Sequence, residues 1–185
     1  VYETLQVMNT LQPGLCVLGT RLPGCFNVFE MSVRAVLGQQ ITVKAASTLA
    51  AMLVAVYGTQ VQTGIEGLTH SFPAPAAILA LGENISEHLG KLGIISARAN
   101  TIYQLARVLA DEKNDFGFCG NPEEEMQKLQ AIRGIGSWTA QYIAMRAMGW
   151  PDAFLPTDAG IKKALPDHTP CLLYTSDAAD EARSV

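Results

Sequence analysis

The chain has 185 residues, about half of them hydrophobic, and carries a formal net charge of −4. These values suffice for one domain with a sizeable core and exclude an intrinsically disordered chain. No apolar run reaches the roughly 20 residues that span a bilayer, and the N-terminus lacks a basic region followed by an apolar block. We therefore expect a cytoplasmic protein without membrane contact. The acidic charge argues against a nucleic-acid partner, because duplex binding usually rests on a basic surface.

Apolar residues at spacings of three and four predict helices along the chain, and no alternating run is long enough for a sheet. The predicted class is therefore all-α. The start at Asn121-Pro122 is the clearest, because three glutamates follow at the positive end of the helix dipole. The predicted helices span residues 1–11, 26–37, 42–57, 76–81, 84–89, 97–110, 122–134, a stretch that Ser137 caps, and 156–165.

The 42–57 helix has Thr42 as its predicted N-cap and Gly58 as its stop. Alanine and leucine cover most of its faces, which predicts a buried central element. Residues 59–69 and 111–120 are predicted to be loops.

The four cysteines are scattered, without a Cys-x-x-Cys pair or a tight cluster. This spacing favours unpaired thiols over a zinc site, an iron–sulfur cluster or a disulfide framework. They are Cys16, Cys25, Cys119 and Cys171.

Both ends of the chain differ from its middle. The chain starts without Met and already in apolar periodicity, so we expect residues 1–25 to be a linker helix ending a preceding segment and residues 26–170 to be the main domain. The segment from Cys171 to Glu181 resembles a translated sequencing adaptor; the alternative is a genuine amphipathic helix end. Without residues 171–185 the chain has 12 basic and 14 acidic residues, a net charge of −2, so the whole-chain charge says little about DNA.

The stretch around residue 135 predicts two helices joined by a glycine hairpin, with the first helix ending at Gly134. Glycine at 134 and 136 removes Cβ atoms where a phosphate has to approach, and Ser137 and Thr139 lie where the next helix presents unpaired N–H groups. Such contacts need little positive charge and carry no sequence information. An ordinary helical hairpin is the competing interpretation, because Gly-x-Gly alone is a weak signal. Three carbonyls here could hold a monovalent cation, Na⁺ or K⁺, that shares the phosphate: those of Gln130, Ile132 and Ile135.

The combination is more specific than its parts. The hairpin, the downstream segment 154–158 and the segment 33–42, Val-Arg-Ala-Val-Leu-Gly-Gln-Gln-Ile-Thr, together resemble the helix-hairpin-helix (HhH-GPD) superfamily of base-excision DNA glycosylases, most closely its bacterial 3-methyladenine DNA glycosylase II branch. The resemblance implies a two-lobed helical bundle with a cleft between the lobes. It also implies a monomeric, nucleoid-associated enzyme that acts on double-stranded DNA with an alkylated base and requires no cofactor.

The resemblance makes Asp158 the catalytic carboxylate. A carboxylate beside C1′ can stabilise the charge that develops as the N-glycosidic bond breaks, and can orient or deprotonate the attacking water. An alkylated purine already carries positive charge, so it needs no general acid. From position alone, a role as the cap of the last predicted helix is favoured over catalysis; the hairpin upstream shifts the preference to catalysis.

Trp138 stands where lyase members of the superfamily have a lysine that forms a Schiff base. Tryptophan cannot do this, so the resemblance implies hydrolysis alone. Trp138 and Tyr142 lie four residues apart and share a helix face. The resemblance implies that they line the base pocket, where electron-rich rings stack on a flipped cationic base. The alternative is an aromatic pair in the core.

Gln40 falls at a break between helices, where the family places the residue that fills the gap left by the flipped base. A role in helix capping is the alternative. The predicted activity is therefore monofunctional removal of alkylated bases, and two other hypotheses stay open: a non-catalytic DNA-binding module, and the glycosylase region of a larger adaptive-response regulator. A chain cut near Pro170 would lack the family's last helices, so we expect marginal folding and poor activity.

Overall fold

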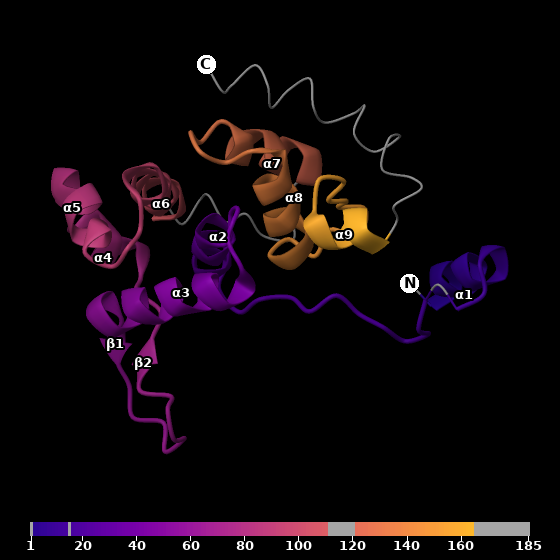
Figure 1. The fold of residues 1–185 in the computed structure, drawn as a ribbon, viewed down its shortest axis with the longest axis horizontal. Coiled ribbons are helices and arrows are strands. Elements are labelled where there is room, and N and C mark those ends of the chain that lie inside the picture. Colours follow the sequence, from indigo (N-terminus) through magenta and orange to yellow (C-terminus); the bar gives the residue numbers. More distant parts are fainter. Residues whose placement is uncertain (1, 15, 111–120, 165–185) are drawn as a thin grey trace.

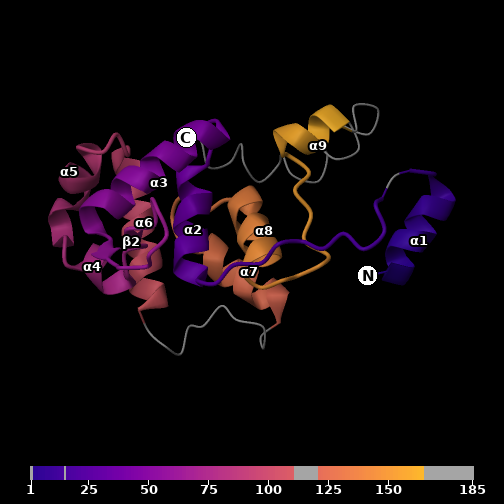
Figure 2. The ribbon, with the colours of Figure 1, turned by 90° about the horizontal axis from the view of Figure 1, so that it is seen from below.

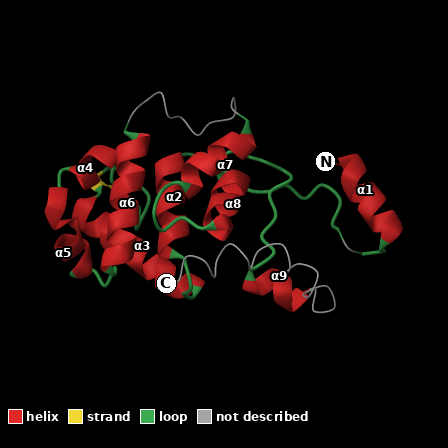
Figure 3. Ribbon diagram, turned by 90° about the horizontal axis from the view of Figure 1, so that it is seen from above, coloured by secondary structure: helices red, strands yellow, loops and turns green. Residues whose placement is uncertain are grey.

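The computed structural model describes residues 2–14, 16–110 and 121–164, and helices dominate this part of the chain (Figures 1 and 3). The all-α prediction is confirmed. The helices are α1 (Tyr2–Leu11), α2 (Val28–Leu37), α3 (Val43–Tyr57), α4 (Pro75–Leu79), the 3₁₀ helix η1 (Gly82–Asn84), α5 (Ile85–Gly90), α6 (Ser96–Leu109), α7 (Pro122–Gln130), α8 (Ser137–Arg146) and α9 (Ala159–Ala164). No helix of the described residues is long and apolar enough to cross a membrane.

Side-chain caps fix the starts of three helices. Asn27 accepts a hydrogen bond from the Glu30 N–H at 2.8 Å, which begins α2. Thr42 caps α3 and Asn121 caps α7, as the sequence predicts. These caps satisfy N–H groups that have no partner inside the helix.

Helix α2 lies between two groups of helices: α3 to α6 on one side and α7 to α9 on the other (Figure 2). Its apolar face is fully buried at Val33, Val36 and Leu37, which follows from their spacing of three and four. This arrangement agrees with the predicted two-lobed bundle. Helix α1 buries none of its residues and lies apart from the bundle at the end of an extended segment (Figure 1).

The prediction that residues 42–57 form a buried central helix is wrong. Only Ala50 and Leu53 of α3 are buried, and Val43 is 84% exposed. Helix α3 packs through one face at the edge of the bundle, with Leu49 and Tyr57 partly buried against the core, and Val43, Met52 and Val56 are exposed. An apolar composition on all faces does not reveal which face finds a partner.

The first two residues of the predicted loop 59–69 form a strand instead, in a small antiparallel ladder. Strand β1 (Thr59–Gln60) pairs with β2 (His70–Ser71), with Thr59 opposite Ser71. Two-residue strands are too short to produce an alternating pattern, so the sequence carries no signal for them. The predicted loop 111–120, the boundary near Pro170, the adaptor-like segment, Cys119 and Cys171 lie outside the described residues.

Candidate functional site

The connection between the two helices of the hairpin, residues 131–136, is longer than predicted. Helix α7 ends at Gln130, four residues before Gly134, so the predicted end is wrong. The chain turns instead through short backbone bonds: Ile132 N–H donates to Leu129 O and Ile135 N–H donates to Ile132 O, each at 3.0 Å. These bonds begin a turn that the helical periodicity of the sequence does not show.

Two features require glycine at position 134: its backbone conformation and the close contact with a neighbouring side chain. Its φ is +93°, a left-handed value that favours glycine. A Cβ at this position would lie 2.1 Å from Thr101 Oγ1 on α6, and the same hydroxyl donates to Arg133 O at 3.0 Å. The missing Cβ of Gly134 therefore makes room for α6, which is a different reason from the phosphate approach that the sequence suggests.

Gly136, not Ser137, is the N-cap of α8. The backbone of Gly136 is extended, its carbonyl accepts from Ala140 N–H at 3.0 Å, and no side chain caps the helix. The prediction that Ser137 caps this helix is therefore wrong: Ser137 is its first residue. The N–H groups of the first turn, at residues 137 to 139, lie at the positive end of the helix dipole with no partner inside the helix.

A cleft of about 1360 Å³ opens beside the start of α8. The turn between α2 and α3, helix α6 and residues 157–160 form its other walls. It brings together every residue predicted to bind DNA, hold the base or act in catalysis: Gln40, Gly134, Gly136, Ser137, Trp138, Thr139, Tyr142 and Asp158. The predicted cation ligands Gln130, Ile132 and Ile135 are not among the residues that line it.

Trp138 and Tyr142 form a stacked pair on α8, with ring centroids 5.2 Å apart and planes inclined by 8°. Both side chains are half-buried and line the cleft. Tyr142 also packs against the core. The pair therefore forms a wall of the cleft, and Tyr142 contacts the core as well. Because the rings cover each other, one outer face of the pair can receive a planar ligand.

Arg146 fixes the far side of this pair, and the sequence reasoning missed it. Its Nη1 donates to the Tyr142 hydroxyl at 3.1 Å, and its guanidinium carbon lies 5.7 Å from the Tyr142 ring centroid. Its Nε donates to Pro23 O at 2.7 Å. Arg146 follows Tyr142 by four residues, so the spacing of helix neighbours is a signal that could have found it.

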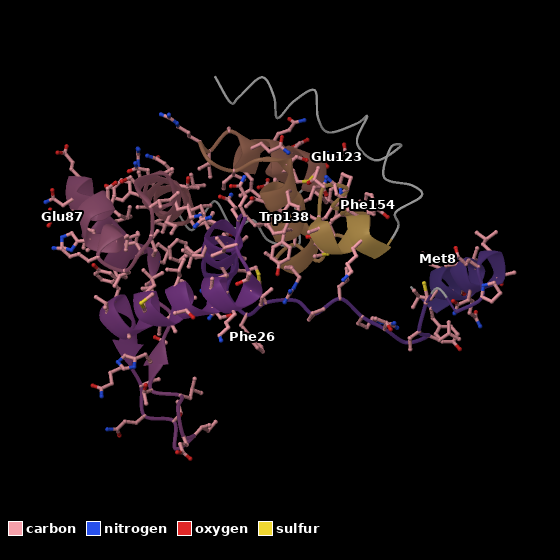
Figure 4. The ribbon with its side chains drawn as sticks, viewed as in Figure 1. Met8, Phe26, Glu87, Glu123, Trp138 and Phe154 are labelled. Atoms are coloured by element: carbon pink, nitrogen blue, oxygen red, sulfur yellow. The ribbon has the colours of Figure 1, made fainter. Side chains whose placement is uncertain are left out.

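Asp158 is held through both carboxylate oxygens. Its Oδ1 accepts from the N–H groups of Gly160 at 2.8 Å and Ile161 at 3.3 Å, which caps α9. Its Oδ2 accepts from the indole Nε1 of Trp138 at 3.1 Å. Figure 4 shows Trp138 projecting from α8 between α2 and α9. Capping, one of the two interpretations of Asp158, is thus observed, and it leaves the carboxylate in the cleft beside Trp138.

Gln40 lies in the turn between α2 and α3, with an exposed side chain and a φ of +54°. It caps neither helix, because Gly38 is the C-cap of α2 and Thr42 the N-cap of α3. Its neighbour Gln39, which the sequence reasoning left without a role, reaches the hairpin: its Nε2 donates to Gly134 O and to Thr139 Oγ1, each at 2.9 Å. No pattern in a single sequence signals a contact across 95 residues.

The packed helices, the glycine hairpin and the aspartate in the adjoining cleft define the class of this protein: a helix-hairpin-helix protein with a carboxylate beside the hairpin. Comparison with known proteins gives the particular family. Residues 33–172 match the model of the HhH-GPD superfamily base excision DNA repair proteins, and the chain belongs to that superfamily. The resemblance that the sequence motifs indicate is confirmed.

Known proteins of this superfamily resemble most of the chain. It is 37% identical over 152 residues to DNA-3-methyladenine glycosylase 2 of Escherichia coli, covering 82% of this chain and 52% of that protein. It is 39% identical over 146 residues to the probable bifunctional transcriptional activator/DNA repair enzyme AlkA of Mycobacterium tuberculosis, covering 79% of this chain and 28% of that protein. A solved 3-methyladenine DNA-glycosylase from Archaeoglobus fulgidus superposes with a TM-score of 0.67 at 29% identity, covering 89% of this chain and 53% of that one. The chain thus spans about half the length of two of these proteins and less of the third.

Proposed function

We propose that this chain carries the core of a monofunctional DNA glycosylase that hydrolyses the N-glycosidic bond of alkylated bases, of the 3-methyladenine type, in double-stranded DNA. The observation that supports this most strongly is the contact between Asp158 Oδ2 and Trp138 Nε1 inside the cleft at the start of α8. It joins a carboxylate and an aromatic surface within one site. The name of the relative from Escherichia coli points to the same activity.

Asp158 stabilises the positive charge that develops at C1′ as the bond to the base breaks. The bonds to its two oxygens fix the orientation of the carboxylate before substrate binds, which lowers the cost of reorganisation in the transition state. The same carboxylate orients or deprotonates the attacking water. A cationic alkylated base departs without a general acid, so one carboxylate suffices.

The stacked rings of Trp138 and Tyr142 offer a surface for the flipped base. An electron-rich face attracts a cationic base more strongly than a neutral one. Trp138 has no amine, so this position supplies no Schiff base and the product is an abasic site.

DNA is held through its backbone at the hairpin. Gly136 and the N–H groups of Ser137 and Thr139 face the cleft at the positive end of α8 and suit a phosphate. The side chain of Gln40 enters the gap that the flipped base leaves. These contacts do not depend on base sequence, and so they suit a protein that scans any DNA.

We propose that the carbonyls of Gln130, Ile132 and Ile135 would hold a monovalent cation, Na⁺ or K⁺. The Ile132 carbonyl accepts one hydrogen bond, from Ile135 N–H, which leaves one of its two lone pairs; within the described residues the other two carbonyls accept no backbone hydrogen bond outside the helices. When bound, the ion supplies positive charge beside the phosphate. We also propose that the protein acts as a monomer. Because the proposed substrate is chromosomal DNA, we expect it to associate with the bacterial nucleoid.

The test is release of methylated bases from alkylated duplex DNA, compared between the wild-type chain, Asp158→Asn and Asp158→Ala. Asp158→Asn removes the negative charge, so its excision rate should fall by at least about a hundredfold. Asparagine keeps an oxygen that can cap α9, so the melting temperature should stay unchanged. Asp158→Ala should lower both the excision rate and the melting temperature. Binding of DNA by the wild-type chain without any excision would instead favour the non-catalytic module.

The relative from Mycobacterium tuberculosis, whose name combines a transcriptional activator with a DNA repair enzyme, favours a second candidate: the glycosylase region of a fusion regulator. The reading frame on both sides of this sequence decides it.

A further inference from the structure

Three segments that are distant in sequence meet at one polar cluster beside the cleft. They are the turn between α2 and α3, helix α6 and the hairpin before α8. Arg98 on α6 donates a hydrogen bond to the backbone carbonyl of Gln39 in the turn. One helical turn further along α6, Thr101 donates to the carbonyl of Arg133 in the hairpin at 3.0 Å. Helix α6 therefore supports both segments from a single face.

Gln39 closes this cluster. Its side-chain amide donates to Gly134 O in the hairpin and to Thr139 Oγ1 in the first turn of α8, each at 2.9 Å. The Gln39 side chain is half-buried, and Thr139 is 2% exposed. The bond to Thr139 is partly buried and the bond to Gly134 is exposed, so the bond to Thr139 is the costlier one to leave unmade. The turn is thus fixed to the two parts of the hairpin that lie nearest the phosphate-binding N–H groups.

Gln40 follows directly on Gln39 in the chain. Its left-handed φ of +54° is uncommon for a residue other than glycine and persists only where the surroundings enforce it. Both the carbonyl and the side chain of Gln39 are held. The backbone that enters Gln40 therefore has little freedom, and its direction is set by the hairpin and α6.

We propose that Gln39 is a positioning residue that couples the wedge turn carrying Gln40 to the hairpin, so that insertion into the duplex and the grip on the phosphate occur as one unit. The inference rests on the proposed function. It assigns Gln39 no contact with the base or the reacting atoms: Gln39 acts through Gln40 and through the start of α8.

A double-mutant cycle tests the coupling. Gln39→Met keeps the length of the side chain and removes the amide donor, Gln40→Ala removes the wedge side chain, and the double variant combines them. Gln39→Glu, which has the size of glutamine without its N–H donors, is measured in parallel in case the methionine variant does not fold. Gln62→Met is the matched control, because Gln62 is an exposed glutamine in the loop after β1, away from the cleft.

The measurement is the single-turnover rate of base release from an alkylated duplex. Gln39→Met should lower the rate about tenfold, as expected for the loss of one or two ordinary hydrogen bonds. Gln40→Ala should lower the rate of base release about tenfold in the wild-type background. In the Gln39→Met background it should lower the rate less than about threefold, because the Gln40 side chain is no longer held in place there. Gln62→Met should match the wild type. A purely structural role for Gln39 would lower stability and leave the effects of the two substitutions multiplicative.

A second readout separates this inference from the proposed function. The ratio of affinities for a duplex with an abasic-site analogue and an intact duplex reports wedge insertion without chemistry, and the same cycle applies to it. Base release by the wild-type chain with multiplicative effects of the two substitutions, or with an unchanged rate in Gln39→Met, overturns the coupling and leaves the glycosylase proposal standing. A wild-type chain that neither releases bases nor prefers the abasic duplex overturns both.

Discussion

In the proposed mechanism, the hydrogen bond from Trp138 to Asp158 makes the indole N–H part of the catalytic arrangement, and Trp138→Phe tests this N–H alone. Phenylalanine keeps an aromatic ring against Tyr142 but offers no donor to Asp158 Oδ2. A hydrogen bond to a charged acceptor contributes roughly 1.5–3 kcal/mol, and each 1.36 kcal/mol corresponds to about tenfold in rate. Both side chains are only half-buried, so we expect the lower end, about a tenfold slower excision step.

The assay is single-turnover release of the base from an alkylated duplex, with affinity for undamaged duplex measured alongside. Affinity should stay within about twofold, because the N–H groups at the start of α8 are backbone groups. Trp138→Ala also removes the stacking surface. It should lower the excision rate strongly while lowering the melting temperature only slightly. Trp150→Phe serves as a control, since Trp150 is half-buried outside the cleft. An excision rate for Trp138→Phe equal to that of the wild type would refute a role for the indole N–H.

Three further predictions follow from single features of the chain. Gly134→Ala should lower the melting temperature more than Gly64→Ala: both force a left-handed backbone that costs about 1–2 kcal/mol, but only the first pushes a Cβ into Thr101. Borohydride should trap no covalent adduct with damaged DNA, because Trp138 offers no amine, and a trapped adduct would contradict hydrolysis alone. Burial raises the pKa of the Cys25 thiol, so at pH 8 alkylation of Cys25, followed by peptide mass spectrometry, should be slower in the folded chain than in denaturant. Equal rates would contradict this.

Elements with strong local signals were predictable. The α2 pattern of Phe29, Val33 and Leu37 and the caps Thr42 and Asn121 were sufficient to locate α2, α3 and α7, because each depends on neighbours within one turn of helix. The boundaries of the hairpin were not predictable from sequence, because the end of α7 and the cap of α8 depend on how the turn packs against α6. The contact of Gly134 with Thr101 spans more than thirty residues, and periodicity does not encode such contacts.

The candidate site divides in the same way. The resemblance identified Asp158, Trp138 and Tyr142, since these positions carry residue types that the chemistry requires. Gln39 and Arg146, which hold the surrounding elements in place, were missed. Their side chains bond to backbone carbonyls, and any residue has a carbonyl. Apart from the four-residue spacing between Tyr142 and Arg146, nothing in the sequence signals these bonds, so the supporting contacts of a site are harder to predict from sequence than its reactive groups.

Asp158 shows why the two interpretations from sequence were not exclusive. A carboxylate has two oxygens with about four lone-pair sites, and in this structure α9 uses Oδ1 while Trp138 uses Oδ2. The bonds that begin α9 therefore also determine where the second oxygen points, so capping and catalytic orientation depend on one side-chain conformation. Helix α9 has six residues, too few to be stable alone. It follows that the order of α9 and the geometry of the site depend on each other.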